Sequence, residues 1–352
     1  MENRYSNHNH IHIEISTSSI LKAVAIILAV IFIYILKDVF IVFLFALIIA
    51  SAITPFADWL DSKGLPRLLG VLMLYLTVFG LVIFVLSLVI PFISNDLSQL
   101  NSTLPKIVEK LSTSLENVQK GSPQYLDFIS EIQNLLESFS AYLQQSSQSV
   151  ISLVVNVFGG LLSFIAIIIS SFYLTVMKKG IESFIESVVP SEYEPYVLDL
   201  WKRSEAKVGR WMQGQLLLAL IVGLIVYVGL SLMGIKFALI LGIMAMALEV
   251  VPMVGPVLAA IPAVFLAFLQ DPSMALWVIL FYVVMQQFES HVLVPVVLSK
   301  AVGLNPVVVI IALLVGAQLA GITGMFISVP VATIIVEMID DVAKQKESKK
   351  AV

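Results

Sequence analysis

Two glutamates, Glu249 and Glu289, lie in an almost entirely apolar part of the chain, and each is followed within six residues by a proline. An ionised carboxylate at the centre of a membrane helix costs roughly 2.5 kcal/mol or more, so a glutamate there is a default candidate for a substrate or ion pathway. Proline removes a backbone donor and breaks helices, which leaves carbonyl oxygens free at membrane depth. This combination predicts a solute-binding or ion-binding site inside a membrane protein.

Helix-breaking residues and polar side chains accompany both glutamates. Broken helices with a nearby carboxylate are a common way to bind ions and polar solutes near the midplane of a membrane. A histidine beside the second glutamate titrates in the physiological range. The residues predicted to bind substrate or ion are Glu249, Pro252, Gly255, Pro256, Gln287, Glu289, His291 and Gln318.

A structural role stays open for both glutamates and for the residues beside them. Glu249 could lie at an interface and reach water. His291 could form a structural hydrogen-bonded pair with a carboxylate rather than a proton relay. Spacings of three and four residues predict that Gln286, Glu289 and Ser290 share a helix face.

A stripe of small residues runs through the last apolar region at four-residue steps: Gly316, Ala320, Gly324 and Ser328. Such stripes let helix backbones approach closely, so the stripe predicts helix packing. The sequence leaves open whether the packing is within one subunit or between subunits. The acidic residues at the end of this region, Glu337, Asp340 and Asp341, are expected to be solvated.

The composition defines a membrane protein. Of 352 residues, 59% are hydrophobic and 12% are charged, against about 45–50% apolar and 25% charged residues in soluble domains. The absence of cysteine excludes disulfides, thiolate metal sites and cysteine nucleophiles. No zinc-protease, serine-hydrolase or P-loop motif is present, so we expect no enzymatic activity, no cofactor, no metal and no nucleic-acid partner.

About eight apolar regions are expected, given the roughly 20 residues that cross a bilayer. The predicted fold is all-α and polytopic, with discontinuous helices in its C-terminal half. Its parts are a cytoplasmic tail at 1–19, transmembrane segments 1–3 at 20–93, an extracytoplasmic helical interval at 94–149, segment 4 at 150–177, a cytoplasmic amphipathic helical interval at 178–213, a transmembrane transport core at 214–339 and a cytoplasmic tail at 340–352.

Two apolar stretches are too long for simple spans. Residues 237–269 would measure roughly 50 Å as one helix at 1.5 Å per residue, and prolines and glycines at 251–256 predict a break there. Residues 306–338 have weak points at Gly321, Gly324 and Pro330, and 274–298 is expected to break at Pro295. Each overlong stretch could be re-entrant or cross the membrane twice.

The distribution of basic residues predicts the orientation. With the N-terminus inside, fourteen Lys and Arg fall on the cytoplasmic side and six on the outer side. Under the positive-inside rule this favours a multi-pass protein of the cytoplasmic (plasma or inner) membrane with both termini in the cytoplasm.

An ordered series of motifs carries a family resemblance. The motifs are Glu249-x-x-Pro252-x-x-Gly255-Pro256, Gln287-x-Glu289 with Val294-Pro295, Val302-Gly303-Leu304-Asn305-Pro306, and Gly316 with Gly321, Gly324 and Val329-Pro330; a weaker match extends upstream through Gly214-Gln215. This series is similar to the autoinducer-2 exporter (AI-2E) family. The resemblance implies eight transmembrane segments, an inner-membrane location, homo-oligomers and transport without nucleotide hydrolysis. It also implies export of a quorum-sensing signal or sodium–proton exchange.

The chain departs from the family pattern at two places. Met177-Lys178-Lys179-Gly180 stands where an aspartate is common, and His291 stands where asparagine or a small residue is expected. The second departure changes one of the polar side chains next to Glu289.

Three functions are compatible with these residues. The main prediction is secondary, non-ATP export of a small polar molecule such as an autoinducer-2-like signal. The alternative is an antiporter that exchanges sodium or another monovalent cation for protons at Glu249 and Glu289. The third is a membrane scaffold whose polar interval at 94–149 recruits a partner. The lipid bilayer and further copies of the chain are the expected partners.

Overall fold

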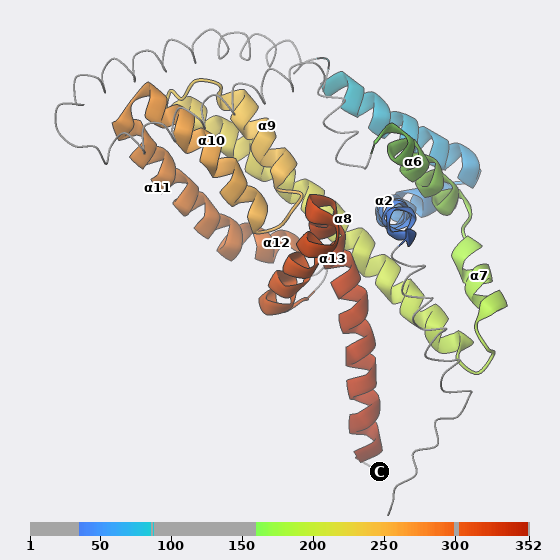
Figure 1. The fold of residues 1–352 in the computed structure, drawn as a ribbon. Helices are drawn as coiled ribbons and strands as arrows, with labels where there is room; N and C mark the ends of the chain where they lie inside the picture. The colour runs from blue at the N-terminus through green and yellow to red at the C-terminus, as the bar shows by residue number, and fades with distance from the viewer. Residues whose placement is uncertain (1–34, 86, 88–159, 299–302, 351–352) are drawn as a thin grey trace, which may run out of the picture. The chain divides into compact units, whose positions relative to one another are not determined.

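The computed structural model describes residues 35–85, 87, 160–298 and 303–350, and every regular element in these ranges is a helix. The elements are α2 (Lys37–Ser62), the helix Arg67–Val85, α6 (Leu161–Val176), α7 (Gly180–Val188), α8 (Glu194–Leu232), α9 (Ala238–Leu248), α10 (Val254–Gln270), α11 (Pro272–Phe288), the π-helical turn η1 (Glu289–Leu293), α12 (Val294–Leu298) and α13 (Pro306–Lys350). Figure 1 shows their order along the chain. The predicted all-α class is confirmed.

The chain divides into two units. Met1–Ile41 includes only the start of α2 among its described residues, and Val42–Val352 contains every contact discussed below. The expected cytoplasmic tail at 1–19, the extracytoplasmic interval at 94–149 and most of the apolar region at 20–36 lie outside the described residues.

Within the described ranges, five helices are long and apolar enough to cross a membrane. They are Lys37–Ser62, Arg67–Val85, Glu194–Leu232, Pro272–Leu298 and Pro306–Lys344. A sixth span results if α6 is joined to α7, although these two helices meet at a bend of 84°. The apolar helices α9 and α10 are shorter. A polytopic helical membrane protein is therefore confirmed as the class.

The predicted break within 237–269 is confirmed between α9 and α10. The backbone turns back at Met253, which has a positive φ of 65°, and the Val254 amide donates to the carbonyl of Pro252 at 2.7 Å. A Cβ on Gly255 would collide with the carbonyl oxygen of Leu248, so only glycine fits this close approach. Pro256 lies in the first turn of α10, where an amide has no intrahelical acceptor.

The second overlong stretch also breaks, at one of its three predicted weak points. Ala320 (φ −148°, ψ 25°) and Gly321 (φ 59°, ψ −140°) leave the helical region, whereas α13 continues through Gly324 and Pro330. The positive φ explains why glycine occupies position 321. The break divides α13 into a first arm, residues 306–319, and a second arm, residues 322–350 (Figure 1).

The predicted break at Pro295 is wrong. The helix continues from Pro272 to Leu298 as one span, and its geometry changes just before the proline, in the π-helical turn Glu289–Leu293. Proline lacks an amide and clashes with the carbonyl four residues earlier in a regular α-helix. The wider turn, in which Val294 donates to the carbonyl of Glu289, accommodates Pro295 without ending the helix.

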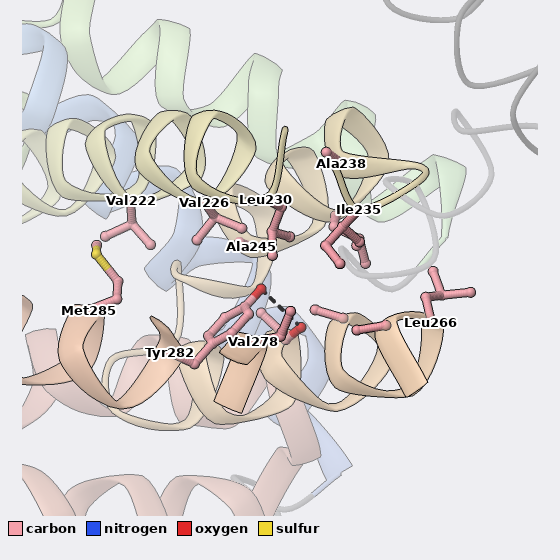
Figure 2. Close-up of a cluster of buried hydrophobic side chains, with 14 of the residues drawn as sticks. Val222, Val226, Leu230, Ile235, Ala238, Ala245, Leu266, Val278, Tyr282 and Met285 are labelled. Carbon is pink, nitrogen blue, oxygen red and sulfur yellow. Dashed lines mark hydrogen bonds between the residues drawn. The ribbon is translucent and has the colours of Figure 1, made fainter. Parts of the chain in front are cut away.

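An apolar cluster joins the C-terminal half of α8 to α9, α10 and α11. Figure 2 shows Val222, Val226 and Leu230 of α8 facing Val278, Tyr282 and Met285 of α11. The hydroxyl of Tyr282 donates to the carbonyl of Ala259 at 3.4 Å. The helices α8 and α9 approach at Gly223 and Gly242, where a Cβ on Gly223 would lie 2.9 Å from the carbonyl oxygen of Gly242. This packing fixes the segments that carry the two glutamates.

Candidate functional site

Glu249 ends α9 at the start of the break. Its side chain is 0% exposed, and its amide donates to the carbonyl of Ala245 at 2.9 Å. Neither carboxyl oxygen has a hydrogen-bond partner among the described residues. The alternative of an interfacial Glu249 that reaches water does not fit this burial.

Glu289 begins the π-helical turn and is 4% exposed. Its Oε2 is also buried without a hydrogen-bond partner in the described part of the chain. The two carboxyl groups are near enough to interact electrostatically. Leu248 directly precedes Glu249, and Leu293 ends the π-helical turn that Glu289 begins. Both leucines pack on the same apolar cluster. Two irregular segments far apart in the chain thus bring two carboxyl groups into one region.

Gln215 of α8 completes this region. Its side chain is 1% exposed, and its Nε2 donates to the backbone carbonyl of Glu249 at 2.5 Å. Its Oε1 is buried without a partner among the described residues. The neighbouring Gly214 allows α12 to approach α8, because a Cβ there would lie 2.7 Å from Leu298. We refer to Gln215, Glu249 and Glu289 as the carboxylate site.

Gln215 is not among the binding residues that the sequence pattern predicts. The available signal was an amide side chain, within the weak upstream match, at the start of the apolar half of α8. Its partner is 34 residues away in sequence, so the spacing patterns of a single helix do not indicate it.

The unpaired atoms of the carboxylate site are all oxygens. Burying a polar group without a hydrogen bond costs about 1–3 kcal/mol, and more for a charged group. Oxygens of amides and carboxylates accept hydrogen bonds and coordinate cations. The site is therefore suited to a ligand that supplies hydroxyl groups, protons or positive charge.

Of the six other predicted binding residues, three are exposed and three shape the break beside Glu249. Gln287, His291 and Gln318 are exposed, and Nδ1 of His291 lies 3.0 Å from the carbonyl of Gln287 in its own helix. Pro252, Gly255 and Pro256 shape the break that holds Glu249. The amide of Gln286 donates to the hydroxyl of Ser290 at 3.4 Å. These two residues are more exposed than Glu289, which is buried. Among the described residues, no three His, Asp or Glu side chains form a metal-binding group.

The small-residue stripe makes contacts within the chain. A Cβ on Gly316 would collide with the carbonyl of Gly324 and lie 2.9 Å from the side chain of Ser328; a Cβ on Gly324 would lie 3.0 Å from that of Ala320. The stripe therefore closes the two arms of α13 against each other.

A second polar cluster lies between α8 and the second arm of α13. Arg203 pairs with Glu337 and with Asp341, the latter at 2.6 Å, and Lys207 also pairs with Glu337. The expectation that Glu337 is solvated is therefore wrong: it is buried between two cations of α8. Asp341 is partly buried as well, whereas Asp340 is exposed. The cations are 134 and 130 residues away from Glu337 in the sequence, which is why local composition misassigned it.

Several apolar spans and buried carboxyl groups beside a broken helix are typical of one class of protein, the membrane transporters. Over residues 23–344 the chain matches the family described as AI-2E family transporter, and it belongs to that family. It is 30% identical over 312 residues to YueF, a candidate transport protein of Bacillus subtilis (strain 168), covering 86% of this chain and 84% of YueF. It is 22% identical over 305 residues to the AI-2 transport protein TqsA of Escherichia coli (strain K12), covering 85% and 84% of the two chains.

Proposed function

We propose that this protein exports a small polar molecule, such as an autoinducer-2-like signal, by a secondary mechanism without ATP. The observation that carries the proposal is the carboxylate site, in which four buried oxygens lack a donor. A polyhydroxylated solute supplies donors to such a site. Membership of the family and similarity to the AI-2 transport protein TqsA support the same solute class.

The proposed mechanism is alternating access around the carboxylate site. Glu249 lies at the α9–α10 break and Glu289 in the π-helical turn, while Gln215 donates to the backbone carbonyl of Glu249. Solute hydroxyls then donate to the unpaired oxygens, which removes the cost of their burial. The proposed setting is the plasma or inner membrane, with both termini in the cytoplasm and several copies of the chain assembled together.

Reconstitution tests this proposal. Purified protein is placed in liposomes that contain autoinducer-2 and no nucleotide, and release is compared between wild type, Glu289→Gln and protein-free liposomes. We expect release only with wild type. Equal release from wild-type and protein-free liposomes would reject autoinducer-2 as the solute.

A second candidate function, exchange of a monovalent cation for protons, is favoured by two buried carboxyl groups with oxygens that lack hydrogen-bond partners among the described residues. Such a pair can exchange a proton for a cation because like charges in a dry site are costly. The test uses a pH-sensitive dye inside the liposomes and additions of sodium, potassium or lithium. Cation-triggered proton flux that Glu249→Gln or Glu289→Gln abolishes would support the exchange. No flux from folded wild-type protein would remove it.

A further inference from the structure

Four residues at four-residue steps along α8 connect the second polar cluster to the carboxylate site: Arg203, Lys207, Trp211 and Gln215. Each step is slightly more than one helical turn, so these side chains follow one slowly slanting line. The first three contact the second arm of α13, and the fourth reaches Glu249. We call the contact between α8 and the second arm the seam.

Aromatic rings fill the middle of the seam. The centroids of Trp211 and Phe326 are 5.7 Å apart, and Phe45 of α2 stacks on Phe326 at 5.1 Å with the ring planes 10° apart. Trp211 is 2% exposed and Phe326 is 5% exposed. Because Trp211 lies one turn of α8 from Gln215, the rings separate the carboxylate site from the charged end of the seam.

Ion pairs close the charged end. Glu337 is held by Arg203 and Lys207 together, and Asp341 is held by Arg203 through two hydrogen bonds of 2.6 and 3.3 Å. Charged hydrogen bonds of this kind are the strong ones, and a buried carboxylate that loses its cations is costly. The seam therefore has two closed positions in series, one ionic and one aromatic.

Two buried hydroxyls lack a hydrogen-bond partner among the described residues, Ser51 in α2 and Ser204 in α8. Hydroxyls buried in helices usually donate to the carbonyl four residues earlier, as Thr175 and Thr333 do at 2.8 Å. The hydroxyl of Ser204 is buried without a partner among the described residues. Ser204 precedes Gln215 by eleven residues, which is three helical turns, so both lie on the same face of α8 with Trp211 between them. Unpaired polar atoms thus occur on both sides of the aromatic rings.

We propose that the seam is the gate through which solute reaches the carboxylate site. Trp211 and Phe326 form the plug, and Arg203, Lys207, Glu337 and Asp341 form the latch. The proposal rests on the proposed function, since a gate needs a transport site behind it. In the proposed orientation the latch faces the cytoplasm.

Thiol labelling tests the gate without knowledge of the solute. The chain has no cysteine, so Gln215→Cys is the single reactive thiol in an otherwise natural background. The rate at which a small water-soluble methanethiosulfonate labels it is measured with the protein in nanodiscs, where the reagent reaches both faces. This background is compared with the same chain carrying Phe326→Ala, which removes the plug, or Glu337→Gln, which weakens the latch.

The matched control is Phe281→Ala, because Phe281 packs on Gly229 and Tyr282 in the apolar cluster, away from the seam. We expect roughly tenfold faster labelling in each seam variant, as the loss of a charge-assisted or buried contact would give, and little change with Phe281→Ala. Labelling is measured only on variants that elute as a folded species in size-exclusion chromatography. If one seam variant does not fold, the labelling rate of the other one tests the gate.

Equal labelling rates in the background and the folded seam variants would overturn the gate. Faster labelling in all variants, control included, would also overturn it, because general loosening would then explain the access. The proposed function is judged separately by autoinducer-2 release from wild-type liposomes. Faster labelling in the seam variants without autoinducer-2 release from wild-type liposomes would reject autoinducer-2 as the solute but support the gate.

Discussion

The break between α9 and α10 and the break within α13 have the same origin in sequence and different consequences. Both interrupt apolar stretches too long for one span, and both use a residue with positive φ, Met253 in the first and Gly321 in the second. At the first break, Glu249 is buried with both carboxyl oxygens unpaired. At the second, the neighbouring Gly316 and Gly324 bring backbone against backbone.

This difference separates a broken helix that carries the proposed site from one that only packs. Proline and glycine determine where the chain can turn, but small residues fill the second break with packing contacts. The first break keeps polar atoms whose partners are missing, and such atoms in a native structure point to function. A third interruption lies at Asp271, between α10 and α11. Its carboxylate accepts hydrogen bonds from the amide and the hydroxyl of Ser273.

Gly255→Val is expected to have the largest effect. The new side chain would meet the Leu248 carbonyl and the Glu249 Cα, the latter at 2.9 Å from Cβ, and neither can move without shifting the break. Overpacking of this kind costs about 1–3 kcal/mol, occasionally more, and here it also displaces Glu249. Both the unfolding temperature and autoinducer-2 release should fall. Gly80→Val is the matched control, because Cβ there meets open space; equal losses in the two variants would contradict the prediction.

Gly316→Val should lower stability but not transport per folded molecule. A Cβ at this position collides with the carbonyl of Gly324, so the two arms of α13 must separate, at a cost of about 1–3 kcal/mol. The measurement is release normalised to folded protein, beside the unfolding temperature. Release per folded molecule that falls as far as it does in Gly255→Val would show that the second break also takes part in transport.

Both breaks are predictable from the sequence, but only part of the carboxylate site is. Proline, glycine and segment length are local properties, so the turns near Pro252 and Gly321 were predictable. Gln215 and Glu337 have partners from distant segments, and no periodicity within one helix indicates such pairs. The break expected at Pro295 did not occur because a π-helical turn relieved the proline instead.

Gln215→Leu should separate stability from function. The change removes a hydrogen bond to the carbonyl of Glu249 and also removes the unpaired Oε1. Loss of the donor leaves the Glu249 carbonyl unpaired at a cost of about 1–3 kcal/mol, and removal of the unpaired Oε1 offsets a similar cost. We therefore expect an unchanged unfolding temperature within a few degrees and autoinducer-2 release reduced roughly tenfold, as loss of one positioning hydrogen bond would give. Unchanged release would remove Gln215 from the site.

Asp271→Asn should have the smallest effect. Hydrogen bonds from the Ser273 hydroxyl and amide lower the pKa of the Asp271 carboxyl below its ordinary value of 3.8. A lowered pKa in the folded state stabilises the protein above pH 3.8, and this contribution is lost as pH falls through the lowered value. Autoinducer-2 release at neutral pH should equal that of wild type, and only the acid limb of unfolding should change. Impaired release would show that a satisfied carboxylate at a break also matters.

The central claim is that the unpaired carboxylate of Glu249 binds solute at some cost to stability. It is tested most directly by measuring the unfolding temperature and autoinducer-2 release of Glu249→Gln in the same liposome preparation. We expect an unfolding temperature equal to or above that of wild type, because an amide of the same shape cannot carry a charge in the buried site, together with loss of release. Release at the wild-type rate from a folded Glu249→Gln protein would contradict it.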